Sequence, residues 1–416
     1  AIDVGVNGTL VRVSNGVYWV TNQVSIVRGI VLRSESGPSN TVIRRTASGG
    51  SPPQHRIVYM AHASASVEGF TITNGYAPTL SAGGGLFCQG GTVRNCQIVG
   101  NWAAGGAASA GGGGVKCSDG ALVSDCVIRG NTAAGHAGGG GVYCGAGGTV
   151  QNCAISGNTG GGNYGGGGGV WCDPGAFVQD CLISGNTGPG GSAAGGVYCN
   201  GGGMVQDCVI TGNQGGYAGA WGGGVRCQNG GTFWNCTISS NNTSPNGNGG
   251  GACISSLGLL RNCLLSGNVA SNTGGGIYCY NGGQVQNCTI AGNSATNGGG
   301  FGGYGAAVVN TILWMNTAGN GQNWLTNGVN TGFTNCCTTP LAGLPGINNT
   351  DGDPLFVGFA SGNYRLQASS AGLNSGTNLV WMAGTLDLDS RPRIIGSGVD
   401  MGAYERPALG TIFVAR

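Results

Sequence analysis

Cysteines recur along this chain in eight pairs, and the members of each pair stand close together at a nearly constant separation. The first members are Cys88, Cys117, Cys144, Cys172, Cys199, Cys227, Cys253 and Cys279, and the second members are Cys96, Cys126, Cys153, Cys181, Cys208, Cys236, Cys263 and Cys288. The pairs repeat at a period of roughly 27 residues, which is typical of a solenoid, in which each repeat packs only against its neighbours. We therefore expect one elongated body rather than a series of globular domains.

The composition excludes several classes of protein. Glycine makes up 93 of 416 residues, but the 12 prolines and the lack of a strict third-residue glycine exclude collagen. Hydrophobic residues at 40% are enough to fill a narrow core. The net charge is +2 and there is no basic run, which argues against nucleic acid as a partner. No cofactor motif is present.

The sequence favours a secreted protein. It has no run of 18 apolar residues that could span a membrane. It begins with Ala1, which we interpret as the start of a mature chain whose signal peptide was removed. Eighteen cysteines, an even number, fit an oxidising compartment. We expect an extracellular or cell-surface location.

Each repeat reads as short strands joined by turns. In residues 138–158, Val142 and Cys144 are two apart, as are Cys153 and Ile155, so the members of each couple share a strand face. The residue before the second cysteine is always Asn or Asp, which tolerates a left-handed turn. Beyond that cysteine, always at the same offset, stands a column of asparagines that can form a hydrogen-bonded ladder: Asn101, Asn131, Asn158, Asn186, Asn213, Asn241, Asn268 and Asn293.

This pattern predicts an all-β protein, a single-stranded right-handed parallel β-helix of about twelve coils, with a rod length on the order of 55–60 Å at the usual strand spacing. Residues 1–80 are expected to form coils without cysteine. Residues 81–300 hold the eight cysteine-pair repeats, and residues 301–416 hold the last coils and a C-terminal closing module.

The chain resembles a known family. Its repeats are similar to secreted right-handed β-helix repeat proteins of bacteria within the pectin-lyase-like group, and more distantly to chlamydial polymorphic outer-membrane proteins. The segments NGVYWVTNQVSIVRGIVLRSESGPSNTVI and DLDSRPRIIGSGVDMGAYE resemble the opening coils and the closing module of that family. The resemblance covers nearly the whole chain. It implies the fold, but members serve as surface proteins, adhesins and carbohydrate enzymes.

The cysteines allow three arrangements. If both members of a pair point inward across the bend, each coil closes its own disulfide, which is the arrangement we expect. Columns of unpaired buried thiols, or disulfides that run up a column, are the alternatives. Cys336 and Cys337 are adjacent and form either a vicinal bond or separate contacts.

The residue before each first cysteine should point outward. That row contains Phe87, Tyr143, Trp171, Tyr198 and Tyr278, together with Lys116, Arg226 and Ala252. Rings and cations in a row could stack glycans or bind a neighbouring subunit. The alternative is that aromatic residues simply suit strands.

Catalytic chemistry has little support in the sequence. Glycosidases need two carboxylates at a set separation, and only 14 Asp and Glu residues occur here. We find no convincing catalytic cluster and expect that the chain is not an enzyme. Two D-x-D pairs, Asp351 with Asp353 and Asp387 with Asp389, are weak calcium candidates, although turn residues explain them as well.

We therefore expect an extracellular structural protein whose subunits stack head to tail into a filament or sheath. Both ends of the chain are rich in β-formers, and open strand edges are templates for pairing. The alternatives are an adhesin or carbohydrate-binding β-helix and, third, a polysaccharide lyase or hydrolase.

Overall fold

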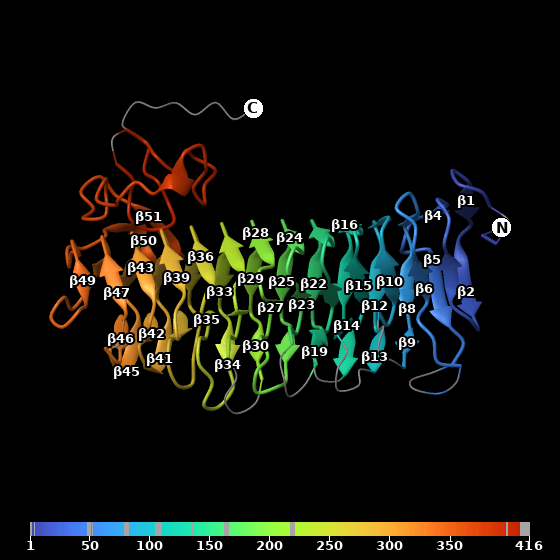
Figure 1. Ribbon diagram of the computed structural model, residues 1–416, viewed down its shortest axis with the longest axis horizontal. Helices are drawn as coiled ribbons and strands as arrows, with labels where there is room; N and C mark the ends of the chain where they lie inside the picture. Colours follow the sequence, from blue (N-terminus) through green and yellow to red (C-terminus); the bar gives the residue numbers. More distant parts are fainter. Residues whose placement is uncertain are drawn as a thin grey trace.

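The computed structural model is a rod built from three long parallel sheets that run its whole length (Figure 1). It describes residues 2–3, 5–47, 51, 53–78, 83–104, 110–134, 137–161, 166–216, 221–328, 330–396 and 398–407. The C-terminal segment that we expected to be rich in strand, Ala408–Arg416, lies outside these residues. Each coil adds one strand to each sheet, so the prediction of an all-β parallel β-helix is confirmed.

The strands of the three sheets are numbered along the chain. The first sheet contains β1 (Leu10–Val13), β4 (Val31–Ser34), β7 (Ser66–Glu68), β11 (Thr92–Arg94), β16 (Leu122–Ser124), β21 (Thr149–Gln151), β24 (Phe177–Gln179), β28 (Met204–Gln206), β32 (Thr232–Trp234), β36 (Leu259–Arg261), β39 (Gln284–Gln286), β43 (Ala307–Val309), β47 (Gly332–Thr334) and β49 (Gly346–Ile347). The second sheet contains β2 (Gly16–Val20), β5 (Thr41–Arg45), β8 (Thr71–Thr73), β12 (Gln97–Val99), β17 (Val127–Arg129), β22 (Ala154–Ser156), β25 (Leu182–Ser184), β29 (Val209–Thr211), β33 (Thr237–Ser239), β37 (Leu264–Ser266), β40 (Thr289–Ala291), β44 (Ile312–Trp314) and β48 (Cys337–Thr338). The third sheet contains β3 (Val24–Ile26), β6 (Val58–Met60), β10 (Leu86–Gln89), β15 (Val115–Ser118), β20 (Val142–Cys144), β23 (Val170–Cys172), β27 (Val197–Asn200), β31 (Val225–Gln228), β35 (Ala252–Ser255), β38 (Ile277–Tyr280), β42 (Phe301–Gly303) and β46 (Trp324–Thr326).

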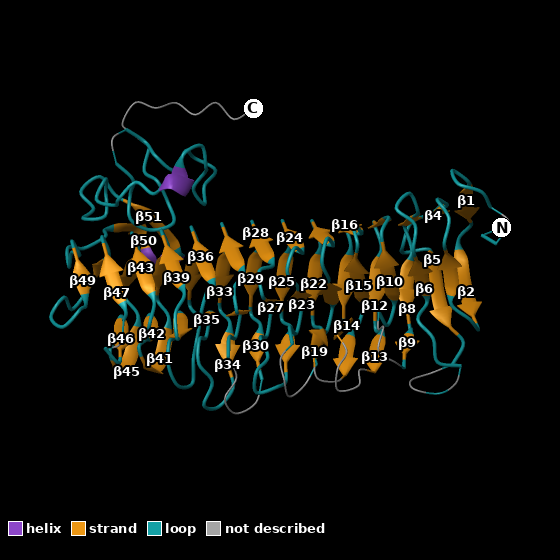
Figure 2. Ribbon diagram, viewed as in Figure 1, coloured by secondary structure: helices purple, strands orange, loops and turns teal. Residues whose placement is uncertain are grey.

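Shorter strands and two 3₁₀ turns complete the structure (Figure 2). Beside the third sheet run β9 (Tyr76–Ala77), β13 (Trp102–Ala104), β14 (Ala110–Gly112), β18 (Thr132–Ala134), β19 (Ala137–Gly139), β26 (Thr187–Gly188), β30 (Gln214–Gly215), β34 (Asn242–Thr243), β41 (Ser294–Asn297) and β45 (Thr317–Asn320). The C-terminal lobe, residues 354–407, holds β50 (Phe356–Gly358), β51 (Asn363–Leu366) and the turns Phe359–Ser361 and Val380–Met382.

The core is a stack of identical positions. In the first sheet Val93, Val123 and Val150 pair in register, and each is fully buried. In the second sheet Ile98 and Ile128 do the same. Burying such side chains contributes roughly 1.5–3 kcal/mol each, so the period of the sequence fixes the stack.

The turn between the first and second sheets uses a left-handed residue in every coil. Asn95, Asp125, Asn152, Asp180 and Asp207 have φ of 51°, 54°, 51°, 52° and 52°. Asn and Asp are the non-glycine residues that tolerate this conformation best. This explains why the column before the second cysteine holds only these two residue types.

The inner asparagines bond one another up the rod. Asn158 donates from Nδ2 to Oδ1 of Asn186 at 2.9 Å and to the carbonyl of Ile128 at 3.0 Å. Asn186 repeats both bonds, to Asn213 and to Ile155, each at 2.9 Å. The same geometry runs from Asn101 to Asn316, so each buried amide is satisfied by the coils on both sides.

The expected in-coil disulfides are wrong: all eighteen cysteines are free and buried. First members lie on the third sheet, whereas second members lie at the turn between the first and second sheets. In every pair except Cys253 with Cys263, the two thiols therefore approach the core from different sides of the coil. Each second-member thiol bonds backbone instead. For Cys181, Sγ donates to the carbonyl of Gln179 at 3.1 Å, and its N–H donates to Sγ of Cys208 at 3.5 Å.

Cys336 and Cys337 also lack a bond to each other. Cys336 packs in the core of the rod, and its thiol donates to the carbonyl of Val308 at 3.4 Å. Cys337 packs under the C-terminal lobe, and its thiol donates to the carbonyl of Gly352 at 3.2 Å. Successive residues of a strand face opposite ways, which separates the two thiols.

Candidate functional site

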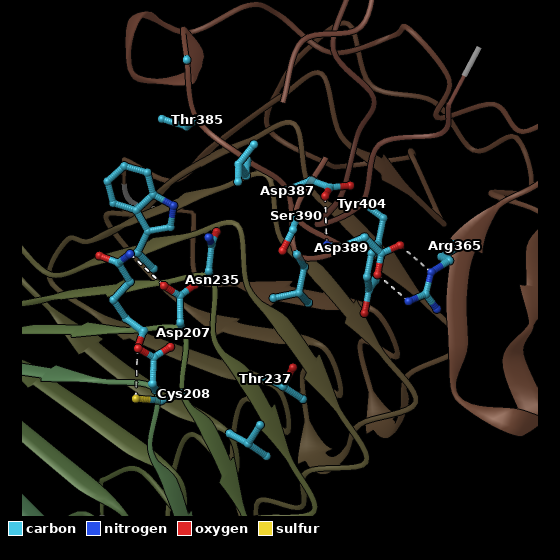
Figure 3. Close-up of a pocket in the computed structure, with 17 residues that line it drawn as sticks. Asp207, Cys208, Asn235, Thr237, Arg365, Thr385, Asp387, Asp389, Ser390 and Tyr404 are labelled. Carbon is cyan, nitrogen blue, oxygen red and sulfur yellow. Dashed lines mark hydrogen bonds and ion pairs between the residues drawn. The ribbon is translucent and has the colours of Figure 1, made fainter. Parts of the chain in front are cut away.

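A cleft of about 690 Å³ lies between the rod and the C-terminal lobe (Figure 3). Its rod side is the turn between the first and second sheets over three successive coils, where Asp180, Asp207 and Asn235 stand. Its lobe side is residues 384–390, with Arg365 from β51 and Tyr404. Such a cleft at the junction of two parts of a fold is a common place for a ligand.

Asp180 and Asp207 are neighbours in a column that otherwise places an amide beside each carboxylate. Asn152 donates to Oδ1 of Asp125 at 2.5 Å, and Asn262 donates to Oδ1 of Asn235 at 2.5 Å. Asp180 and Asp207 follow each other directly in this column, and Asp207 accepts from Nε2 of Gln206 at 2.8 Å. Burial, helped by the Asp207 charge, raises the pKa of Asp180. The sequence already places Asp180 and Asp207 at successive positions of the turn column. It does not reveal that the lobe covers these positions and forms a cleft with them.

The lobe wall is rich in charge that is already paired. Arg365 forms a two-pronged ion pair with Asp389, with 2.5 Å between Nε and Oδ2, and Arg391 lies 3.1 Å from the same oxygen. Asp387 accepts the backbone N–H groups of Asp389, Arg391 and Glu405, although burial still raises its pKa. Among the described residues, the carboxylates of the cleft without a cationic partner are therefore Asp180 and Asp207, on the rod side.

Aromatic side chains complete the cleft. Trp234 lies at one end, with the Arg261 guanidinium 5.5 Å from its ring and Trp381 in an edge contact at 5.8 Å. Burial raises the pKa of Tyr404 to about 12, and Arg365 lies 5.0 Å from its ring. Carboxylates, hydroxyls and ring faces together suit a polyhydroxylated ligand. Sequence reasoning did not find Trp234, Arg365 or Tyr404.

The lobe is held on the rod by hydrogen bonds to asparagines of the turn between the first and second sheets. Arg393 is fully buried and donates to Oδ1 of Asn262 at 3.2 Å, and Asn310 donates to the carbonyl of Thr377 at 2.8 Å. Glu405 lies 3.2 Å from Arg393. Burial raises the pKa of Glu405 to about 9, against the opposing attraction of Arg393.

The row before the first cysteines does not face solvent as we expected. Phe87, Tyr143, Trp171 and Tyr198 are 8%, 8%, 7% and 2% exposed, and Lys116 and Tyr278 are half-buried. Glycines pack closely against this row. A Cβ added to Gly139 would come within 2.8 Å of the Trp171 backbone nitrogen. The expectation that this row faces solvent and binds glycans or a neighbouring subunit is therefore wrong, because the row is covered.

Within this row, rings and cations follow one another. Lys116 lies 5.2 Å from the Phe87 ring and 5.1 Å from the Tyr143 ring. Trp171 stacks on Tyr198 at 4.5 Å. These contacts stabilise the rod from within.

The row that contains Trp171 and Tyr198 includes Cys253, where we expected Ala252. Cys253 pairs with Arg226 and Tyr278, while Ile254 takes the inward place between Cys227 and Cys279. A one-residue slip moves a side chain to the other face of a strand. The sequence signal was the separation between Cys253 and Cys263, which is the longest among the eight pairs.

The four calcium candidates do not meet. Asp351 and Asp353 are exposed after β49, whereas Asp387 and Asp389 are in the lobe, engaged as described above. In the described part of the chain, no group of three or more His, Cys, Asp or Glu side chains is placed to hold a metal ion. No described helix is both long and apolar enough to cross a bilayer.

Both ends of the rod leave strands unpaired among the described residues. At one end β1, β2 and β3 pair only with β4, β5 and β6. At the other end β49 pairs only with β47, and beyond β48 only Thr350 adds a bridge, to Cys337 (Figure 1). Residues 339–345 lie near the end of the third sheet, where Trp324 donates to the Pro340 carbonyl.

The comparisons with known proteins concern the fold. No protein-family model matches the chain, and no curated protein matches it. Among solved structures, a pectate lyase is 15% identical with a TM-score of 0.41, covering 97% of this chain and 90% of its own. The A-module of a mannuronan C-5 epimerase of Azotobacter vinelandii is 14% identical with a TM-score of 0.38, covering 80% and 91%. An α-1,3-glucanase catalytic domain in complex with tetrasaccharides is 12% identical with a TM-score of 0.38, covering 82% and 63%.

These comparisons correct one expectation. We expected from the sparse carboxylates that the chain is not an enzyme, but the similar structures named above are all enzymes named for polysaccharides. That expectation is withdrawn. At 12–15% identity the likeness extends to the β-helix and no further, so it assigns no activity to this chain.

Proposed function

We propose that this protein is an extracellular structural subunit that stacks head to tail into a filament or sheath. The observation that carries the proposal is that both ends of the rod present open strands of the same sheets. Among the described residues, the first and second sheets end in unpaired strands at both ends, and all of these strands run parallel. An unpaired edge is a template for another strand, and a contact between two different ends repeats without closing.

Apolar exposure at the ends supports the same proposal. Val11 and Val24 occupy inward columns but are only half-buried, because no coil covers them. Val17, Trp19 and Ile347 lie in outward columns and are 54%, 55% and 64% exposed. A second copy placed in register would bury Val11 and Val24, at roughly 25 cal/mol for each Å² removed from water, and would cover only the end-facing edges of the three outward side chains.

Negative-stain microscopy and light scattering over a concentration series test this proposal. The wild-type chain is expected to form unbranched filaments whose mass grows with concentration. Ile347→Lys places a charge on the last strand and should abolish growth. Leu182→Lys is the matched control, because Leu182 is 46% exposed on the side of the rod, and it should assemble normally. A wild-type chain that stays monomeric at high concentration contradicts the proposal.

The cleft supports a second candidate function, saccharide binding. Its specific observation is the Asp180–Asp207 pair beside ring faces and hydroxyls. A carboxyl with a raised pKa beside a second carboxylate is also the arrangement that glycosidases use, so cleavage belongs in the same test.

Asn is the common residue of the turn column, so Asp180→Asn and Asp207→Asn remove charge without disturbing the fold. Both are expected to weaken saccharide binding in calorimetry, and any release of reducing ends, by at least about tenfold. Asp125→Asn, in the same column but outside the cleft, is the control. Equal behaviour of all three variants contradicts this candidate.

A further inference from the structure

The two ends of the rod differ in charge. Residues 262–350 contain no Asp, Glu, Lys or Arg, so the charges that follow at the far end are those of Asp351 and Asp353. Both side chains are exposed, directly after β49 and the Thr350 bridge that end the first and second sheets. The last coil of the rod therefore presents only negative charge.

The first coil is basic. Residues 1–30 hold Arg12 and Arg28 against Asp3, and all three side chains are exposed. Arg28 donates to the carbonyls of Asp3 and Gly5, and no described carboxylate forms an ion pair with it. The end that holds β1 and β2 thus has the opposite sign from the end that holds β49.

Arg12 is the end member of a column of charged residues. In the first sheet Arg12, Arg33, Glu68 and Arg94 stack in register. Glu68 bonds Arg33 at 2.6 Å and Arg94 at 3.0 Å, which lowers its pKa to about 2. Arg12 stacks on Arg33 with no acid on either side, and no described residue pairs with Arg12 or with Asp351. Arg12 therefore adds to the positive charge of this end of the rod.

Building on the head-to-tail proposal, we propose that the joint between copies is set by charge: the acidic last coil of one copy docks on the basic first coil of the next. The partner is a second copy of this chain. In continued register the column of Ile347 leads to Arg12, and Asp351 lies one turn further along the same coil. Like ends repel and unlike ends attract, which makes the filament polar and excludes head-to-head pairing.

Charge also makes assembly sensitive to salt. Charges on an exposed joint are screened over about 8 Å at physiological ionic strength. The critical concentration for growth is therefore expected to rise with sodium chloride, whereas a joint held by apolar contacts alone would be strengthened or unaffected.

Two charge-reversed chains test the inference. One carries Arg12→Glu and Arg28→Glu, so both of its ends are acidic, and the other carries Asp351→Lys and Asp353→Lys, so both of its ends are basic. Each alone is expected to raise the critical concentration by at least about tenfold. Mixed in equal amounts, they should co-assemble in strict alternation at close to the wild-type concentration. All four side chains are exposed, and circular dichroism checks that each chain folds.

The outcomes separate the two proposals. If wild-type chains form no filaments, head-to-tail stacking itself fails. If wild-type chains polymerise and either reversed chain polymerises equally well alone, the joint does not depend on charge and this inference is overturned. The same follows if both folded variants stay monomeric when mixed.

Discussion

The rod and the C-terminal lobe solve the burial of polar groups in different ways. In the regular coils of the rod, amides bond amides and thiols bond carbonyls. The buried Arg45 of β5 lies under the irregular loop that follows this strand, where it donates to the carbonyls of Asn74, Ser51 and Pro53. The lobe buries Arg393 with Glu405, Asp387 and Asp400, all 2% exposed or less. The comparison teaches that repetition can satisfy polar groups without charge, because each coil supplies the partners of the next, whereas an irregular segment needs a specific buried cation.

The largest expected effect concerns the buried cation of the lobe. Arg393→Leu leaves the buried Asp387 and Asp400 without the nearby cation and removes the donor of the Asp400 and Gly402 carbonyls, which costs about 3–5 kcal/mol, because the buried partners are left uncompensated. We expect the lobe to detach while the rod stays folded. Limited proteolysis should cut residues 354–407 first. Arg391→Leu, a half-buried arginine of the same lobe, is the control, and equal loss in both variants would contradict this view.

Asn186→Ala tests the asparagine ladder of the rod. It removes the acceptor of two buried donors, the backbone N–H and the side-chain amide of Asn158, which costs about 2–6 kcal/mol at about 1–3 kcal/mol for each unsatisfied buried group. The midpoint of urea unfolding should fall. Ser184→Ala, on a half-buried side chain of the same coil, should change it little. If the two substitutions cost the same, the ladder does not stabilise the rod.

The pH dependence should separate the two regions with opposite signs. The folded pKa of Glu68 is about 2, below its ordinary 4.5, so its contribution is present above pH 4.5 and is lost as the pH falls toward 2. The folded pKa of Glu405 is about 9, so its contribution is complete below pH 4.5 and is lost as the pH rises toward 9.

Acid should therefore weaken the first coils of the rod, and alkali should weaken the lobe. Hydrogen exchange at several pH values measures both regions in one experiment. Glu68→Gln should remove only the loss of stability at acid pH, and Glu405→Gln only the loss of stability at alkaline pH. The same pH dependence in both regions would contradict the assignment.

The smallest expected effect is that of a reductant. Because the thiols are unpaired, dithiothreitol should leave the melting temperature unchanged. Thiol titration should find eighteen reactive groups in denaturant and almost none in the native state. Fewer groups in denaturant would mean that disulfides form after all.

Sequence reasoning predicted the repeating parts of this fold well and the cleft poorly. Val93, Ile98 and Asn101 recur with the period, so one coil specifies all the others. The slip at Cys253 and the burial of Trp171 went unpredicted, because each depends on where a neighbouring stretch of backbone lies. Asp180 and Asp207 were noticed in their turn column, but the loop that makes them a cleft wall, residues 384–390, lies far along the chain.

By itself, the sequence determined that each coil lies on the one before, since period, inward columns and left-handed turns are local properties repeated many times. Only the tertiary structure decided which side chains are covered, where the lobe docks and that the thiols stay apart. These outcomes depend on contacts between segments that share no period, and their geometry follows from packing rather than from spacing along the chain.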